Sequence, residues 1–235
     1  MGNKYFGTDG VRGVANVFPM TADFAMKLAM ACAETVCTNK RKVAIGKDTR
    51  LSGDMLEAAL TAGFTAKGVD VVRLGVLPTP AVTTVTPKLG VDMAVMITAS
   101  HNPYKDNGIK LVAADGEKFS DEVTAELEAK VIAGEFNFDE DKIGAVSDNH
   151  QAVDEYIKIA KSTAKGSQPL KGLKVILDCA NGVFSKIMPQ VYKDFGAEVI
   201  AMACEPDGLN INRDCGSMHP QKMMERVKAE QADLG

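Results

Sequence analysis

The sequence predicts an α/β protein made of two tandem domains. Each is expected to have three α/β/α layers around a mixed, mostly parallel sheet. Short apolar runs of strand length alternate with amphipathic runs of helix length along most of the 235 residues. An acidic, turn-rich stretch at residues 134–149 interrupts this alternation and is typical of a solvated linker. We therefore expect one domain over residues 1–150 and a second over residues 151–235.

Composition argues against several classes of partner. A net charge of −4 without a long basic run disfavours nucleic acid or an anionic membrane surface as the main partner. No apolar stretch is long enough to span a bilayer, and the N-terminal residues lack an apolar signal-peptide core. The five cysteines form no C-x-x-C pair, which indicates reduced, mostly buried thiols and a cytoplasmic protein.

The first domain opens on a glycine-rich segment at residues 7–13. Its glycines let the backbone approach a ligand, and Thr8 and Arg12 could supply an oxyanion with a hydroxyl donor and a charged fork. A mobile N-terminal loop is the alternative. Periodicity then predicts, in order, helix 21–36, strand 42–45, helix 54–66, strand 69–74, helix 82–89, strand 93–98, strand 109–112 and helix 121–133.

The stretch Met93–Val112 carries the strongest indication of function. A short apolar strand runs into the turn Ala-Ser-His-Asn-Pro, which places Ser100 and His101 where the strand ends. Arg50 follows an earlier strand, at the carboxyl edge where open α/β sheets bind ligands. A serine beside a histidine, with lysines downstream, is compatible with phosphoryl chemistry. A polar turn between two strands is the alternative.

The second domain is expected to hold helix 152–161, strand 173–177, helix 184–195, strand 197–202 and helix 220–231. Its loop at residues 205–217 carries Asn210, Asn212 and Arg213, which are polar enough to meet a substrate or another domain; an ordinary surface loop is equally compatible. The alternation requires a new strand where the sequence ends, so this domain is expected to be incomplete. Neither a dinucleotide fingerprint nor a Walker sequence is present, which disfavours nucleotide binding.

Several motifs, in register along essentially the whole chain, resemble the α-D-phosphohexomutase family. They are Tyr5-Phe-Gly-Thr-Asp-Gly-Val-Arg-Gly13, Gly46-Lys-Asp-Thr-Arg-Leu-Ser-Gly53, Pro78-Thr-Pro80, Thr98-Ala-Ser-His-Asn-Pro103, Asp106-Asn-Gly-Ile-Lys110, Asp178-Cys-Ala-Asn-Gly182 and Glu205-Pro-Asp-Gly208. The opening motif points to the glucosamine branch of that family. The resemblance implies an enzyme of four domains, so we expect domains III and IV to lie outside this chain.

The resemblance also implies roles for individual residues. Ser100 would carry the phosphoryl group, and its phosphate would give one oxygen to Mg²⁺. Lys110 would act as general acid or base. The candidates for binding substrate phosphate are Thr8, Arg12, Arg50, His101 and Asn102. The three aspartate ligands of Mg²⁺ are expected just beyond Gly235, so we expect the chain alone to be inactive.

The implied reaction interconverts glucosamine 6-phosphate and glucosamine 1-phosphate through a sugar bisphosphate, on the route to UDP-N-acetylglucosamine. The expected partner is therefore a phosphosugar, and a homodimer is left open. Two alternatives remain. One is a phosphomannomutase or phosphoglucomutase, and the other is a non-catalytic module that binds a phosphosugar or a partner.

Overall fold

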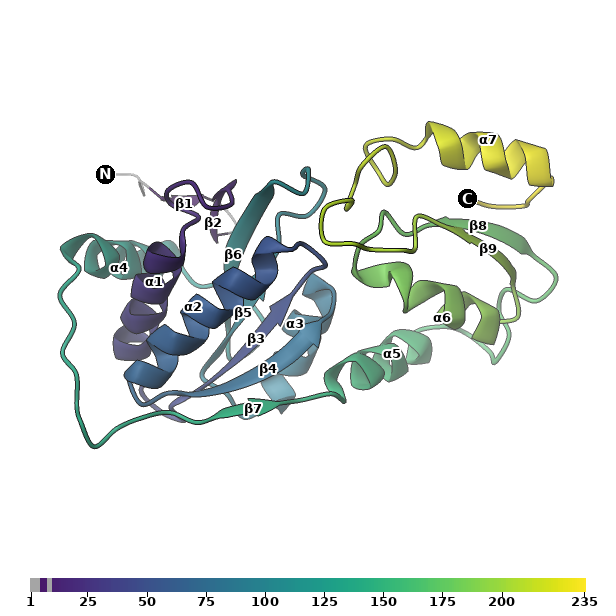
Figure 1. Cartoon of the computed structure of the whole chain (residues 1–235). Helices are drawn as coiled ribbons and strands as arrows, with labels where there is room; N and C mark the ends of the chain where they lie inside the picture. Colours follow the sequence, from purple (N-terminus) through teal and green to yellow (C-terminus); the bar gives the residue numbers. More distant parts are fainter. Residues whose placement is uncertain (1–4, 8–9) are drawn as a thin grey trace. The chain divides into compact units, whose positions relative to one another are not determined.

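The computed structural model describes residues 5–7 and 10–235, which form two compact units (Figure 1). The first unit takes in the chain up to Ala152 except for two turns, Thr49–Leu51 and Ser100–Tyr104. These turns belong with the second unit, which continues over Val153–Gly235. That the two units correspond to the first two family domains, divided near residue 150, stays a prediction.

A seven-stranded mixed sheet organises the first unit, with the strand order β1-β2-β6-β5-β3-β4-β7. Pairing is parallel among β5, β3, β4 and β7, and antiparallel among β1, β2, β6 and β5. The predicted α/β class with a mixed sheet is therefore confirmed. The strands are β1 (Phe6–Gly7), β2 (Gly10–Val14), β3 (Lys42–Lys47), β4 (Asp70–Val76), β5 (Met93–Ile97), β6 (Asp106–Ala113) and β7 (Val146–Asp148).

Helices cover both faces of this sheet because its central strands are apolar on both sides. On one face, Ile45 of β3 shares a buried cluster with residues of α1 (Ala22–Thr35) and α2 (Ser52–Ala66). On the other face lies α3 (Thr79–Val85), and a Cβ added at Gly46 would come within 2.9 Å of Val82 Cγ2. The three-layer arrangement is visible in Figure 1, where α1 and α2 lie side by side.

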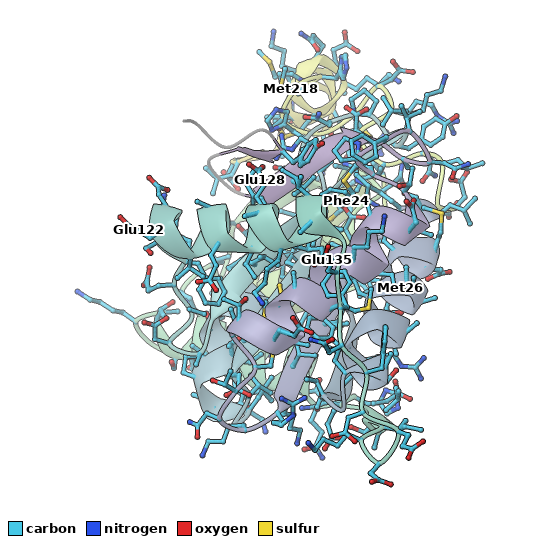
Figure 2. All side chains as sticks on the ribbon, turned by 90° about the vertical axis from the view of Figure 1, so that its left-hand side faces the viewer. Phe24, Met26, Glu122, Glu128, Glu135 and Met218 are labelled. Atoms are coloured by element: carbon cyan, nitrogen blue, oxygen red, sulfur yellow. The ribbon has the colours of Figure 1, made fainter. Side chains whose placement is uncertain are left out.

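Helix α4 (Asp121–Ala133) holds the first strand through a buried carboxylate. Glu128 is only 7% exposed, and its Oε1 accepts hydrogen bonds from the amides of Tyr5 and Phe6. Figure 2 looks onto this helix, with Glu128 on the side of the N-terminal strands and Glu122 at the exposed N-terminal end. Burial of this polar group is tolerated because its oxygen accepts both backbone hydrogen bonds.

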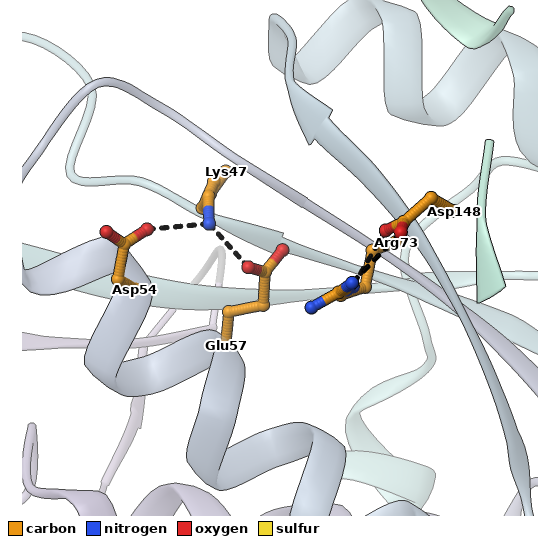
Figure 3. A network of polar contacts seen from close by, with 5 residues as sticks. All are labelled: Lys47, Asp54, Glu57, Arg73 and Asp148. Carbon is orange, nitrogen blue, oxygen red and sulfur yellow. Dashed lines mark hydrogen bonds and ion pairs between the residues drawn. The ribbon is translucent and has the colours of Figure 1, made fainter. Parts of the chain in front are cut away.

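An ion-pair network ties the carboxyl end of β3 to α2 (Figure 3). Lys47 Nζ pairs with Glu57 and, at 2.7 Å, with Asp54 Oδ1. Burial alone would lower the pKa of Lys47, but hydrogen bonds to these two carboxylates raise it above its ordinary value. Beside it, Arg73 of β4 makes a bidentate pair with Asp148 of β7, which fastens the edge strand.

The second unit contains a parallel pair of strands, β8 (Lys174–Asp178) and β9 (Glu198–Met202). At the C-terminal end, Leu234 forms an isolated parallel bridge with Val175. Within the described part of the chain, no helix is both long and apolar enough to cross a membrane. The helices of this unit are α5 (Ala152–Ser162), α6 (Met188–Asp194) and α7 (Gln221–Glu230).

The structure differs from the sequence prediction where backbone pairing overrides local composition. Residues of the expected glycine-rich loop form β1 and β2, because Gly10 (φ 117°) lets β2 lie against β6: a Cβ there would come 2.2 Å from Ile109 O. The end of the expected linker forms β7. The helix expected over residues 82–89 ends earlier and continues as a 3₁₀ turn, since Pro87 lacks the amide needed to extend it.

Replacing Gly63 with alanine should destabilise the protein, although helix propensity alone favours alanine by about 1 kcal/mol. An added Cβ would lie 2.4 Å from Met26 O and 2.7 Å from Ala29 Cβ, forcing α1 away from α2. We expect a loss of about 1–3 kcal/mol in the free energy of unfolding, measured by urea denaturation. The exposed neighbour gives the control: Ala62→Gly should lose only about 1 kcal/mol. A stabilised Gly63→Ala variant would contradict this packing.

Glu34 should stabilise the fold only where it is ionised. Its carboxylate joins Lys67 (2.6 Å) and Lys130 (3.2 Å). Desolvation opposes ionisation, but the hydrogen bonds from both lysines outweigh it and hold the pKa below 4.5. Glu34→Gln should therefore cost about 1 kcal/mol at neutral pH, and the difference should vanish as pH falls through the folded-state pKa. Denaturant melts of both proteins at several pH values test this.

The control for Glu34→Gln is Glu126→Gln at an exposed position of α4. It should change the free energy of unfolding little at any of these pH values. A Glu34→Gln difference of the same size at neutral and strongly acidic pH would show that the ion pairs do not produce it.

Candidate functional site

Ser100 lies exposed in a turn at the end of the fully buried strand β5. Its φ of 56° is left-handed, a conformation that costs a residue other than glycine or asparagine about 1–2 kcal/mol. Such strain persists only where the surrounding structure over-determines the backbone, and it concentrates at functional sites. The turn therefore needs partners that hold it.

Arg50 is one of those partners. It is only 2% exposed, and its guanidinium donates three hydrogen bonds to main-chain carbonyls of the turn. Nη1 donates to Pro103 O at 2.5 Å, while Nη2 donates to Ser100 O at 3.0 Å and to Asn102 O at 2.9 Å. Hydrogen bonds from a charged group stabilise by about 1.5–3 kcal/mol each, enough to offset the strain at Ser100.

A hollow of about 290 Å³ in the first unit brings Arg12 and Lys110 together. Arg12 of β2 pairs with Gly108 of β6, and Lys110 lies two residues further along β6, so the two cations share one face of the sheet. Cationic side chains beside glycine backbone form a site suited to an anion of phosphate size. The hollow is lined by Gly7, Gly10, Val11, Arg12, Thr98, Gly108 and Lys110.

Buried polar contacts fix the strand ends that border this hollow. Thr98 Oγ1 donates to Asp48 Oδ2 at 2.7 Å, and this aspartate is only 4% exposed. Asn107 is completely buried: its Nδ2 donates to Ser52 Oγ at 2.9 Å and its Oδ1 accepts from the Gly108 amide at 2.8 Å. Because Asp48, Thr98 and Asn107 are buried and hydrogen-bonded, they hold β5 and β6 in place.

The residues predicted from the sequence fall into two groups. Arg12 and Lys110 lie together in the first unit, and Arg50, Ser100 and Asn102 lie together in the second. The remaining two are His101, which is exposed in the same turn as Ser100, and Thr8, which lies outside the described residues. Sequence reasoning missed the contributions of Thr98, Asp48 and Asn107. Polar side chains that directly follow or precede apolar strands were the available signal.

Cys37 and Cys179 do not offer a nucleophile at neutral pH. All five cysteines are free. Burial raises the pKa of Cys37 to about 12, and burial together with the neighbouring Cys204 raises that of Cys179 to about 12. Thiols with such pKa values stay protonated and unreactive, so the expected reduced, structural role fits them.

The described residues do not by themselves form a metal centre. Over residues 5–7 and 10–235, no group of three or more His, Cys, Asp or Glu side chains is arranged to hold a metal ion. A phosphate on Ser100 would contribute oxygen, but a Mg²⁺ site also needs carboxylates.

The fold and the serine turn define the class of protein. Residues 3–138 match the family model described as phosphoglucomutase/phosphomannomutase, alpha/beta/alpha domain I. A crystal structure of a phosphoglucomutase/phosphomannomutase family protein from Burkholderia thailandensis has a TM-score of 0.81 and 27% identity, covering 97% of this chain and 50% of that one. The chain belongs to the phosphohexomutase family, as its motifs predicted.

Curated relatives indicate the branch within the family. The chain is 51% identical to a phosphoglucosamine mutase from Paramagnetospirillum magneticum and 48% identical to one from Alcanivorax borkumensis. Each alignment covers 100% of this chain and 53% of the relative. The chain thus spans about half the length of the curated relatives that it matches.

If the hollow binds phosphate, its two cations should supply most of the affinity. We expect Arg12→Gln and Lys110→Gln each to weaken binding of inorganic phosphate by roughly tenfold, the loss of one charged hydrogen-bond donor. Titration followed by ¹H–¹⁵N NMR measures this, through shifts of the Gly10 and Gly108 amides. The control is Lys118→Gln, an exposed lysine outside this hollow. Equal affinity in all four proteins would exclude the hollow as the anion site.

Proposed function

We propose that this chain is part of a phosphoglucosamine mutase that interconverts glucosamine 6-phosphate and glucosamine 1-phosphate. The observation that carries the proposal is Ser100, exposed in a left-handed turn whose carbonyls are tied by the buried Arg50. The names of the relatives support the choice of sugar. The reaction lies on the route to UDP-N-acetylglucosamine, and we assign it to the cytoplasm.

In the proposed reaction, phosphorylated Ser100 gives its phosphoryl group to a hydroxyl of the sugar phosphate. The bond from phosphorus to Ser100 Oγ breaks, a bond from phosphorus to the sugar oxygen forms, and the hydroxyl proton passes through Lys110 to the departing Ser100 Oγ. The resulting bisphosphate reorients and returns its other phosphate to Ser100 Oγ. In this second transfer the proton passes from Ser100 Oγ through Lys110 to the sugar oxygen that leaves, so serine phosphate and base are both regenerated.

Cationic and polar groups would hold the phosphates during these transfers. We assign this role to Arg12 in the hollow and to His101 and Asn102 in the serine turn, together with Thr8. Positive charge and donors fixed in advance stabilise the charge that develops on a transferring phosphoryl group. Arg50 would act on the same reaction by holding the turn.

Mg²⁺ would supply further neutralisation of charge on the phosphoryl group. A phosphate on Ser100 would give the ion one oxygen, and since the chain spans 53% of its curated relatives, we propose that the carboxylate ligands belong to the rest of the longer protein. The proposed catalytic unit is therefore the longer protein, with its third and fourth domains, and we expect this chain alone to be inactive and to bind Mg²⁺ weakly.

The test is turnover by the longer protein and by its Ser100→Ala variant. We expect glucosamine 6-phosphate to be consumed, with loss of roughly 10³-fold or more in the variant because the phosphoryl carrier is gone. The control is Ser120→Ala, at the N-cap of α4, which should keep full activity.

The same assay decides between the alternatives. Preference for mannose or glucose phosphates over glucosamine phosphate would support the phosphomannomutase or phosphoglucomutase alternative. Binding of phosphosugars without any turnover would support a non-catalytic module. A fully active Ser100→Ala variant would refute the role of the serine in all of these enzymes.

A further inference from the structure

Asn212 binds the serine turn from a distant part of the sequence. Its Nδ2 donates to Ser100 O at 2.9 Å and to Asn102 O at 2.9 Å, the two carbonyls that also accept from Arg50 Nη2. Both partners are carbonyl oxygens, which only accept, so the side-chain amide must present its NH₂ group here. Each of the two oxygens therefore receives two donors, one from a guanidinium and one from a carboxamide.

The loop that carries Asn212 is anchored to the end of β8. The backbone amide of Asn212 donates a hydrogen bond to Ala180 O at 2.9 Å. Asp178, the last residue of β8, accepts from the Ala180 amide at 2.9 Å and from the Gly216 amide at 2.7 Å, which closes the loop on both sides of Asn212. The carboxamide is thus delivered by backbone that is itself held, and its φ of 59° suits an asparagine.

Neighbouring side chains brace the same loop. Asn210 Nδ2 donates to Glu205 O at 2.8 Å, and its Oδ1 accepts from the Asp207 amide at 3.1 Å. Asn181 Oδ1 accepts from the Glu205 amide at 3.0 Å. Asn212 therefore differs from the other asparagines here, because its side chain points its donors out of the loop and onto the serine turn.

The two hydrogen bonds to each carbonyl oxygen restrain the backbone at Ser100. With Ser100 O and Asn102 O each bound twice, the Ser100–His101 and Asn102–Pro103 peptide planes cannot rotate without breaking hydrogen bonds. The backbone that carries the Ser100 side chain is restrained on its C-terminal side, which limits the directions in which Oγ can point. Reacting groups must be placed this closely, because a displacement of about 1 Å can cost roughly 10²-fold in rate.

We propose that Asn212 is a positioning residue for Ser100, acting through the carbonyls of the turn. With Arg50, it sets the direction in which the serine presents its phosphate. The role deepens the proposed function and rests on it, but the position of a phosphate can be measured on this chain without turnover.

The test compares this chain with its Asn212→Asp variant, both carrying phosphoserine encoded at position 100. Aspartate keeps the size of the side chain and tolerates the left-handed backbone, but it turns an oxygen toward each carbonyl in place of a donor. The readouts are the ³¹P resonance of the phosphoserine and the ¹³C carbonyl resonances of Ser100 and Asn102. Asp214→Asn is the matched control, an isosteric exchange at an exposed left-handed position of the same loop.

We expect Asn212→Asp to move both carbonyl resonances upfield and to shift the ³¹P resonance toward its position in the denatured chain. Asp214→Asn should leave all three resonances in place. If Asn212→Asp does not fold, Asn212→Gly, which also accepts a positive φ, should show the same shifts. Unchanged ³¹P and carbonyl resonances in the folded variant would overturn the positioning role. A longer enzyme that turns over substrate without phosphate on Ser100 would instead contradict the proposed function, and would leave the contact of Asn212 with the turn unaffected.

Discussion

The serine turn depends on donors for its own main-chain carbonyls. At the end of β5, Ser100 is held in a left-handed conformation. The buried guanidinium of Arg50 and the carboxamide of Asn212 provide the hydrogen bonds. A buried arginine is costly without partners, and here its donors meet carbonyls that need them. The same contacts satisfy a charge and fix a candidate phosphoryl carrier.

The sheet provides the other half of the candidate chemistry. The antiparallel register between β2 and β6 places Arg12 and Lys110 on one face of the sheet. Gly10 and Gly108 let neighbouring backbone approach closely, and both line the hollow that contains the two cations. Two cations on a rigid sheet need no reorganisation to meet an anion. The candidate anion-binding side chains therefore take their positions from strand pairing, whereas the candidate phosphoryl carrier, Ser100, lies in a turn.

Much of the fold was predictable because its central strands are apolar and its helices periodic. The strand Met93–Ile97 and the helix α4 (Asp121–Ala133) could both be predicted from the sequence alone. The β1–β2 hairpin and β7 were missed, since glycine-rich and acidic segments become strands only through partners distant in sequence. Ser100 was found from its motif, and Asn212 was noted as a polar residue able to meet a substrate or another domain. Its actual partner, the serine turn, lies about a hundred residues away and could not be read from the sequence.

The central claim is that Ser100 carries the phosphoryl group. The most direct measurement treats the longer protein with a sugar bisphosphate and maps the phosphorylated peptide by mass spectrometry. The account predicts a single phosphate, on the peptide containing Ser100 and at that residue. Phosphate on another residue, with Ser100 unmodified under conditions of full turnover, would contradict it.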